Sequence, residues 1–463
     1  MSRFISPRQQ LVYRSQLLKQ VKREVKQFRL QSLHRAVLTK LAQQTPPLRM
    51  RRTWDIEAKV GKQPSVKLSA DSGVIPIFDR IGGKLLILGT MGSGKTTTLM
   101  GLTKVLVSRA LQDEGEPIPV ILNLKSWNPN QAAIANWIIE QIERKYNISS
   151  ELSAYWIDQL QILPLLDGLD EVKLEHLELC IQQLNQWLQS DLAPLHLIVC
   201  STVESYYHCD NKLQLNGAIL LKALTKNQVR DYLLQARSRE LWNGIEDDKN
   251  LMKLAQKPLF LTMMALAYEE ILLASWKRLS SIEEQTRYLF NAFIRRQITQ
   301  NRDELNQMSS YNLEQIRQGL EWIAQRLEEE NITEFSVDEI PANWLKESEE
   351  EKTYQWRIRI VKGVVWWGII AGIVIGILIQ SIFILLLCMG IGFAWALISE
   401  FFSIDKLIEQ FILRSIISSK GYVPWKYQQF LNDAKRQLIL QQVGNRYRFI
   451  HRRLQQHLAQ IRI

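Results

Sequence analysis

The segment 89–96 constrains the fold of this chain more than any other part of its sequence. It consists of Gly89, Thr90, Met91, Gly92, Ser93, Gly94, Lys95 and Thr96, and it fits the pattern G-x-x-x-x-G-K-[ST]. An apolar run precedes it and an amphipathic stretch begins at about Lys95, which predicts a strand, a loop and a helix. Glycines let backbone N–H groups turn inward around an anion, and a helix N-terminus adds the positive end of its dipole. The segment therefore predicts a phosphate-binding loop, with a chance match to the pattern as the alternative.

The side chains that end this loop have separate expected roles. Lys95 is expected to reach the β- and γ-phosphates of a nucleoside triphosphate. The Thr96 hydroxyl is expected to bind Mg²⁺, whose other ligands are mostly water and phosphate oxygen. Thr97 follows directly and is expected to be a further contact to the nucleotide.

A second segment, 162–172, reads ILPLLDGLDEV and supplies three acids. Its apolar part predicts a strand that ends at Asp167, and ligands of parallel sheets bind beyond the carboxyl ends of the strands, so Asp167 is expected to reach the Mg²⁺. Asp170 and Glu171 are expected to orient and polarise a water molecule for attack on the γ-phosphate. The candidate catalytic residues are Lys95, Asp170 and Glu171. An acidic turn at the surface is the alternative interpretation of these acids.

Short apolar runs alternate with amphipathic helices from about residue 75, which is typical of a parallel sheet with crossover helices. The expected strands are 85–88, 120–124, 162–166 and 195–200. Between about 225 and 345 the periodicity is helical throughout, and helices are expected from Thr225, over 251–270 and over 283–300. Residues 401–463 show the order helix, strand, turn at Gly444-Asn445, strand and helix, which resembles a winged helix.

The N-terminal region is strongly basic. Residues 1–45 are expected to be helical, and the first fifty residues contain eleven Lys or Arg against one acid, Glu24. The whole chain has a formal net charge of +11. Such a surface favours phosphate-bearing partners, but charge alone does not choose between phospholipid head groups and nucleic acid. A solvated helix face that serves only solubility is the alternative.

Residues 363–398 form 36 successive positions without a charge, which is typical of a membrane segment. One straight helix of this length would be about 54 Å long, against a hydrocarbon core of about 30 Å. We therefore expect a hairpin of two short spans, 363–379 and 382–398. The cations that favour a cytoplasmic entry precede the first span and are Arg357, Arg359 and Lys362. A strongly tilted single span and a buried pair of core helices are the alternatives.

The two phosphate-site segments together resemble the NACHT family of signal-transducing NTPases, in particular its bacterial members. Further segments are similar to family segments in the expected order, namely Pro119 to Trp127, Leu213 to Leu233, Leu251 to Tyr268 and Phe449 to Ala459. The resemblance covers most of the chain from about residue 75. It implies ATP or ADP with Mg²⁺ as the bound cofactors.

The resemblance implies roles for three further positions. Thr202 stands where the sensor strand of the family usually ends in arginine, and an uncharged hydroxyl cannot offset charge that develops on the γ-phosphate, so slow or absent hydrolysis is expected. Pro258 matches the family proline that packs near the adenine. His451 matches the winged-helix histidine that contacts the β-phosphate of bound ADP. An ordinary proline at a helix start and an ordinary histidine of a core or surface are the alternatives.

These observations predict an α/β P-loop NTPase domain with a parallel sheet, followed by an all-α helical domain, a transmembrane insertion and a C-terminal winged-helix-like domain. The expected boundaries are 1–74 for the basic helical region, 75–235 for the NTPase, 236–355 for the helical domain, 356–400 for the membrane segment and 401–463 for the winged-helix-like domain.

The expected function is a membrane-tethered switch in signal transduction or defence that hydrolyses ATP to ADP. ADP is expected to hold the winged-helix unit against the NTPase, and ATP to release it for self-oligomerisation. If His451 contacts nucleotide held by Lys95, both units must lie on one side of the membrane, so we expect both in the cytoplasm, at a bacterial inner membrane. Membrane lipid and an unidentified protein are the other expected partners. The alternatives are a nucleotide-binding scaffold without turnover and, less favoured, an ATP-regulated nucleic-acid-binding protein.

Overall fold

The computed structural model describes most of the chain in two compact units. The described residues are 6–42, 56–60, 66–68, 74–129, 133–300, 313–330, 332–336, 344–345, 352–360, 374, 404–444 and 446–460. The first unit comprises 1–303, 331–333 and 437–444, and the second comprises 304–330, 334–436 and 445–463.

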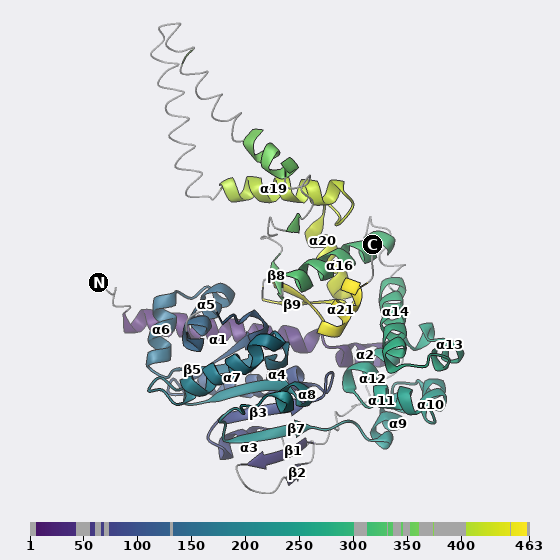
Figure 1. Cartoon of the computed structure of the whole chain (residues 1–463), viewed down its shortest axis with the longest axis horizontal. Coiled ribbons are helices and arrows are strands. Elements are labelled where there is room, and N and C mark those ends of the chain that lie inside the picture. Colours follow the sequence, from purple (N-terminus) through teal and green to yellow (C-terminus); the bar gives the residue numbers. More distant parts are fainter. Residues whose placement is uncertain are drawn as a thin grey trace. The chain divides into compact units, whose positions relative to one another are not determined.

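The first unit is built around a seven-stranded sheet with the order β2-β1-β7-β3-β6-β5-β4 (Figure 1). The strands are β1 Ile56–Val60, β2 Val66–Leu68, β3 Lys84–Gly89, β4 Ile118–Asn123, β5 Ile162–Asp167, β6 Leu197–Thr202 and β7 Gly217–Leu221. The five strands from β7 to β4 run parallel, and β1 pairs antiparallel with β7 and β2. The predicted parallel α/β sheet is confirmed, with β1, β2 and β7 as strands that were not predicted.

The strand order brings the ends of β3, β6, β5 and β4 to one edge of the sheet. The register pairs Gly89, at the end of β3, with Thr202 at the end of β6. It likewise pairs Asp167, at the end of β5, with Asn123 at the end of β4. The four residues lie at one edge because the strands that they end are parallel neighbours.

Helices cover the faces of this sheet, and their bounds are α3 Ile75–Arg80, α4 Lys95–Gln112, α5 Ile134–Tyr146, α6 Ser150–Asp158, α7 Leu174–Leu188 and α8 Val203–His208. Two one-turn helices follow strands, η2 Leu124–Ser126 after β4 and η3 Leu169–Glu171 after β5. On α4 the buried positions Leu99, Leu102, Leu106 and Ala110 recur at three- and four-residue spacing, so one face of the helix joins the core.

The basic N-terminal region forms two helices, α1 Pro7–Leu30 and α2 Leu33–Ala42, instead of one. Ser6 and Gln9 form a capping box that fixes the start of α1. Arg14 of α1 is buried and donates to the carbonyl oxygens of Ala110, Asp113 and Glu116 at 3.2, 3.3 and 2.7 Å. These carbonyls lie at and just beyond the C-terminal end of α4, where a cation is favourable. The helix α1 is therefore packed on the phosphate-loop helix.

The helices that follow the sheet in the first unit are α9 Lys226–Gln235, α10 Arg239–Ile245, α11 Lys249–Ala255, α12 Pro258–Ala267, η4 Tyr268–Glu270, α13 Leu273–Lys277 and α14 Ile282–Gln300. Thr225 caps α9 as predicted, through a capping box with Gln228. The single helix predicted over 251–270 is wrong, because Pro258 has no N–H to donate and starts a new helix.

The second unit contains α16 Leu313–Glu329, β8 Phe335–Ser336, α19 Ile404–Ser419, α20 Tyr427–Arg436, β10 Arg446–Phe449 and α21 Arg452–Gln460. Its core includes Trp322, whose ring stacks on that of Tyr422 at 5.6 Å between centroids. The strand β9 Leu440–Val443 belongs to the first unit. The order helix, strand, strand, helix predicted near the C-terminus is confirmed by α20, β9, β10 and α21.

The predicted membrane hairpin, 363–398, lies outside the described residues except for Val374. Within the ranges that the structure describes, none of the helices combines the length and the apolar character needed to cross a bilayer. The hairpin therefore stays a prediction.

Candidate nucleotide site

The loop between β3 and α4 has the backbone shape that its glycines predict. Gly92 and Gly94 have φ angles of +81° and +98°, a region that side-chain-bearing residues seldom adopt. Gly94 is the N-cap of α4, so the free N–H groups of that helix face the loop. A Cβ on Gly92 would lie 3.3 Å from Cβ of Leu259, which leaves little room for a larger residue. The loop therefore has a backbone shape that suits an anion at the N-terminus of α4.

Two polar side chains of the loop fit an anionic ligand. Lys95 Nζ donates to the carbonyl oxygens of Gly89 and Thr90 at 3.3 and 3.4 Å, so its ammonium group lies against the loop. Ser93 is 3 % exposed, and its Oγ has no hydrogen-bond partner among the described residues. A buried hydroxyl without a partner is costly, and a ligand of this loop would give it one.

The predicted Mg²⁺ ligands are brought together from distant parts of the sequence. Thr96, in the first turn of α4, donates from Oγ1 to Oδ2 of Asp167 at 2.7 Å, across a separation of 71 residues. A hydroxyl and a carboxylate oxygen are the hard ligands that Mg²⁺ prefers, and the ion commonly takes one or two protein ligands together with water and phosphate oxygen. These two residues therefore fit Mg²⁺.

The two acids after Asp167 are held by different partners. Oδ1 of Asp170 accepts a hydrogen bond from the backbone N–H of Thr202 at 3.1 Å. Burial raises the pKa of Asp170; the Lys95 ammonium opposes this shift and the Asp167 carboxylate adds to it. A carboxyl group with a raised pKa beside a phosphate-binding lysine is typical of a functional site.

Glu171 has a partner that was not predicted from the sequence. Nδ2 of Asn123 donates to Oε2 of Glu171 at 3.3 Å, and Oδ1 of the same amide accepts from the N–H of Lys125 at 2.7 Å. The second bond fixes the Asn123 amide at the end of β4, so the first can orient the Glu171 carboxylate. The only sequence signal for Asn123 is a polar residue at the end of an apolar run; its position beside Glu171 depends on the pairing of β4 with β5.

Thr202 has a structural role at the position where the resemblance implies arginine. It is 4 % exposed, ends β6 and is the N-cap of α8. Its hydroxyl lies 2.9 Å from Oγ of Ser205 and accepts from the N–H of that residue at 3.4 Å. Position 202 therefore supplies no cation to the site, while its N–H positions Asp170.

Pro258 lies in a segment that contacts the loop directly. It is the first residue of α12, and the N–H of the next residue, Leu259, donates to the carbonyl oxygen of Gly92 at 3.2 Å. The start of α12 thus forms part of the loop's surroundings, and a contact of Pro258 with the nucleotide stays a prediction.

His451 belongs to the second unit and precedes α21. Its Nδ1 accepts from the N–H of Arg453 at 3.1 Å, and its carbonyl oxygen accepts from the N–H groups of Leu454 and Gln455. The residue therefore caps this helix. Its contact with ADP stays a prediction.

Comparison with known proteins adds distant structural likenesses, and three of them follow. No family model matches the chain, and no curated protein matches it. Cdc6p from Pyrobaculum aerophilum has a TM-score of 0.29 at 13% identity, over 84% of this chain and 91% of that chain. The Orc1 protein of Aeropyrum pernix, solved in complex with DNA, has a TM-score of 0.27 at 13% identity, over 61% of this chain and 76% of that chain.

The third likeness is the Walker-type ATPase paby2304 of Pyrococcus abyssi, with a TM-score of 0.26 at 10% identity, over 81% of this chain and 90% of that chain. All three TM-scores lie below 0.5, so these likenesses do not define the class of the protein. Its class follows from its own residues. A glycine loop between a central strand and a helix, with an acid at the end of a nearby parallel strand, is the site of a P-loop NTPase. The chain has this fold and this site.

Proposed function

We propose that the chain is an ATP-binding switch of the NACHT type that hydrolyses ATP to ADP. The observation that carries the proposal is the 2.7 Å hydrogen bond between Thr96 and Asp167, because it joins the two segments that separately predicted a phosphate loop and a metal ligand. The choice of ATP and of the NACHT type rests on the sequence resemblance from about residue 75 onward.

In the proposed reaction the residues of this chain bind, orient and polarise. The loop N–H groups and Lys95 hold the triphosphate tail, and Thr96 with Asp167 holds Mg²⁺, which offsets the negative charge of the phosphate oxygens. Glu171, oriented by Asn123, polarises a water molecule in line with the γ-phosphate. Asp170, which lies at the same edge of the sheet, helps Glu171 to orient and polarise this water molecule.

A second candidate function is nucleotide binding without turnover, and the environment of Thr202 favours it. The hydroxyl of Thr202 is engaged with Ser205, and its N–H is engaged with Asp170. No guanidinium from this position offsets charge on the γ-phosphate during transfer, and such a cation contributes strongly to phosphoryl transfer. Because Thr202 stands where the resemblance implies arginine, we expect slow hydrolysis or stable binding of ATP.

The proposed switch has three further features. Residues 363–398 anchor it in a membrane as a hairpin, with the NTPase and the C-terminal unit both in the cytoplasm. His451 contacts the β-phosphate of ADP in the resting state, and exchange for ATP releases the C-terminal unit and permits self-oligomerisation. The process that it serves is signal transduction or defence.

Two measurements on gently solubilised full-length protein test the proposal. Mass spectrometry of released nucleotide should find ADP or ATP in the natural chain and none in Lys95→Ala. Steady-state phosphate release should be abolished by Glu171→Gln without loss of the retained nucleotide. Retained nucleotide with no phosphate release from the natural chain would select the scaffold without turnover. Absence of any nucleotide from intact protein would reject both functions.

A further inference from the structure

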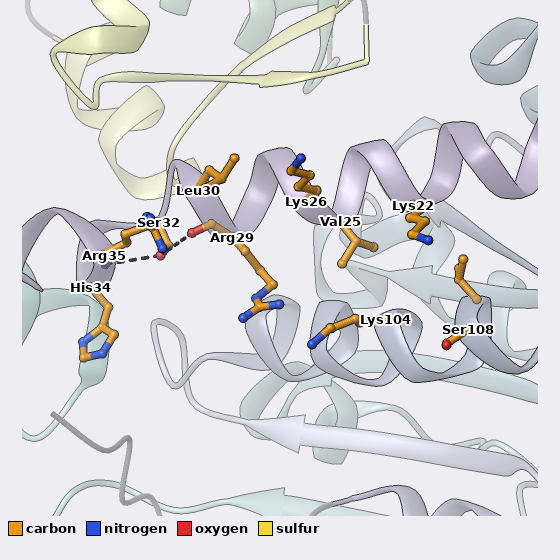
Figure 2. Close-up of a pocket in the computed structure, with 11 residues that line it drawn as sticks. Lys22, Val25, Lys26, Arg29, Leu30, Ser32, His34, Arg35, Lys104 and Ser108 are labelled. Atoms are coloured by element: carbon orange, nitrogen blue, oxygen red, sulfur yellow. Dashed lines mark hydrogen bonds between the residues drawn. The ribbon is translucent and has the colours of Figure 1, made fainter. Parts of the chain in front are cut away.

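A cavity of about 700 Å³ lies among α1, α2 and α4 of the first unit (Figure 2). Five of the described residues that line it are lysine or arginine, and none of these described lining residues is acidic. The basic residues are Lys22, Lys26 and Arg29 of α1, Arg35 of α2 and Lys104 of α4. Val25 and Val107 also border the cavity, but both are buried in the core and expose almost no surface to it. The described lining of the cavity therefore favours an anion.

Four of the five cations of the cavity are not neutralised by the described part of the protein. Lys22, Lys26, Arg29 and Lys104 are exposed, and none of them forms an ion pair with another residue in the described part of the chain. The single acid of α1, Glu24, faces inward and bonds to Lys145 at 2.8 Å instead. Like charges gathered without acids repel one another, so a bound anion would stabilise this arrangement.

Two of the basic side chains, Arg29 and Lys104, come from facing helices. In Figure 2 Arg29 extends from α1 toward α4, and Lys104 extends from α4 toward Arg29. Lys22 precedes Arg29 by seven residues on α1, which places the two on one side of the helix, whereas Lys26 points away from α4 in Figure 2. Two facing walls with cations can hold more than one phosphate group at once, and the planar guanidinium of Arg29 suits bidentate contacts.

The cavity is separate from the candidate nucleotide site. Lys104 lies nine residues beyond Lys95 on α4, a separation of about 13 Å along the helix axis at about 1.5 Å per residue. None of the residues 89–97 lines the cavity, and neither does Asp167. The two sites share only the helix α4, which begins at the phosphate loop and continues into the cavity wall.

We propose that this cavity binds a small soluble molecule that carries two or more phosphate groups. The phosphates lie between Arg29 and Lys104. The cavity has the volume of a small-molecule site, for which about 300–1,000 Å³ is usual. A nucleic acid would instead need cations that track an extended backbone, whereas these surround one hollow.

The test measures binding of inorganic tripolyphosphate to the full chain, with Lys95→Ala as the background so that the phosphate loop is disabled. The cavity variant adds Arg29→Ala and Lys104→Ala. The matched control adds Lys19→Ala and Arg23→Ala, which remove two exposed cations of α1 outside the cavity. We expect tripolyphosphate to bind the background, roughly tenfold or more weaker binding to the cavity variant, and less than about threefold weaker binding to the control.

Several results would overturn the proposal. The first is absence of tripolyphosphate binding to the Lys95→Ala background. The second is equally weakened tripolyphosphate binding in the cavity variant and the control, which would indicate a diffuse positive field. A third is binding of phosphatidylglycerol vesicles or single-stranded DNA that depends on the cavity pair when tripolyphosphate does not bind. Equal thermal midpoints of the variants establish that they are folded, and Arg29→Gln with Lys104→Gln replaces the cavity pair if they differ. Since the background lacks Lys95, these results are independent of ATP binding at the loop.

Discussion

Replacement of Glu24 tests whether the basic N-terminal helix is an integral part of the NTPase unit. The Glu24 side chain is 4 % exposed, and it accepts hydrogen bonds from Lys145 Nζ at 2.8 Å and from the Tyr146 hydroxyl at 3.0 Å. Both donors also bond to the carbonyl oxygen of Ile121, so Glu24→Ala leaves them partly satisfied. Removal of one partner of a buried ion pair costs about 3–5 kcal/mol, and we expect the lower end, about 3 kcal/mol.

The thermal midpoint of the first unit measures this loss. At about 2.1 cal/mol/K per residue over roughly 300 residues, about 3 kcal/mol corresponds to a decrease of about 5 °C. The matched control is Glu283→Ala, which breaks the exposed pair with Arg287 and should change the midpoint by less than about 1 °C. Equal small shifts for the two variants would refute the inferred anchoring of α1.

Two further predictions concern the nucleotide site. Burial raises the pKa of Asp170 above its ordinary value of 3.8, so the stability linked to its neutral form is complete below that value and is lost as the pH rises through the higher folded-state pKa. Asp170→Asn should therefore raise the denaturant midpoint of the nucleotide-free protein at pH 7 and leave it nearly unchanged near pH 3.5; an equal gain at both values would contradict this. Asn123→Ala removes the hydrogen bond that orients Glu171 and should reduce kcat for ATP by about three- to tenfold, in line with a hydrogen bond of about 1 kcal/mol, while the Kd for ATP stays constant. An unchanged kcat, or a loss entirely in Kd, would exclude a role for Asn123 in positioning Glu171.

The phosphate loop and its acids could be predicted because each is a local pattern. An apolar run, a glycine loop and a helix start lie within about a dozen residues around Gly92. The second segment is equally local, because its apolar run and its three acids lie within residues 162–171. Asn123 was not predicted, since its role depends on β4 lying beside β5. Strand β7 was not predicted, because its partly buried residues Ala218 and Leu220 are as apolar as the buried Ile219 and Leu221. The short run therefore shows no alternation of apolar and polar residues.

The basic N-terminal helix shows the limit of charge patterns. Its cations predicted a surface for anionic partners, yet Arg14 and Glu24 face inward and bond to residues that lie 96 and 121 positions away. An ionisable residue enters a core only with a partner, and no local pattern of α1 identifies partners so distant in sequence. A helix start at Pro258 was kept as an alternative, but the apolar period continues across this position and led to the prediction of one helix over 251–270, which is wrong.

Calorimetry of ATP binding with and without Mg²⁺ tests the joining of loop and acid most directly. The natural chain should bind ATP more tightly with Mg²⁺ than without it, because Thr96 and Asp167 hold the ion against the phosphates. Asp167→Asn should lose most of this difference and keep Mg²⁺-free binding of ATP. Folded natural protein that binds no ATP, or that binds it equally with and without Mg²⁺, would contradict the proposed site.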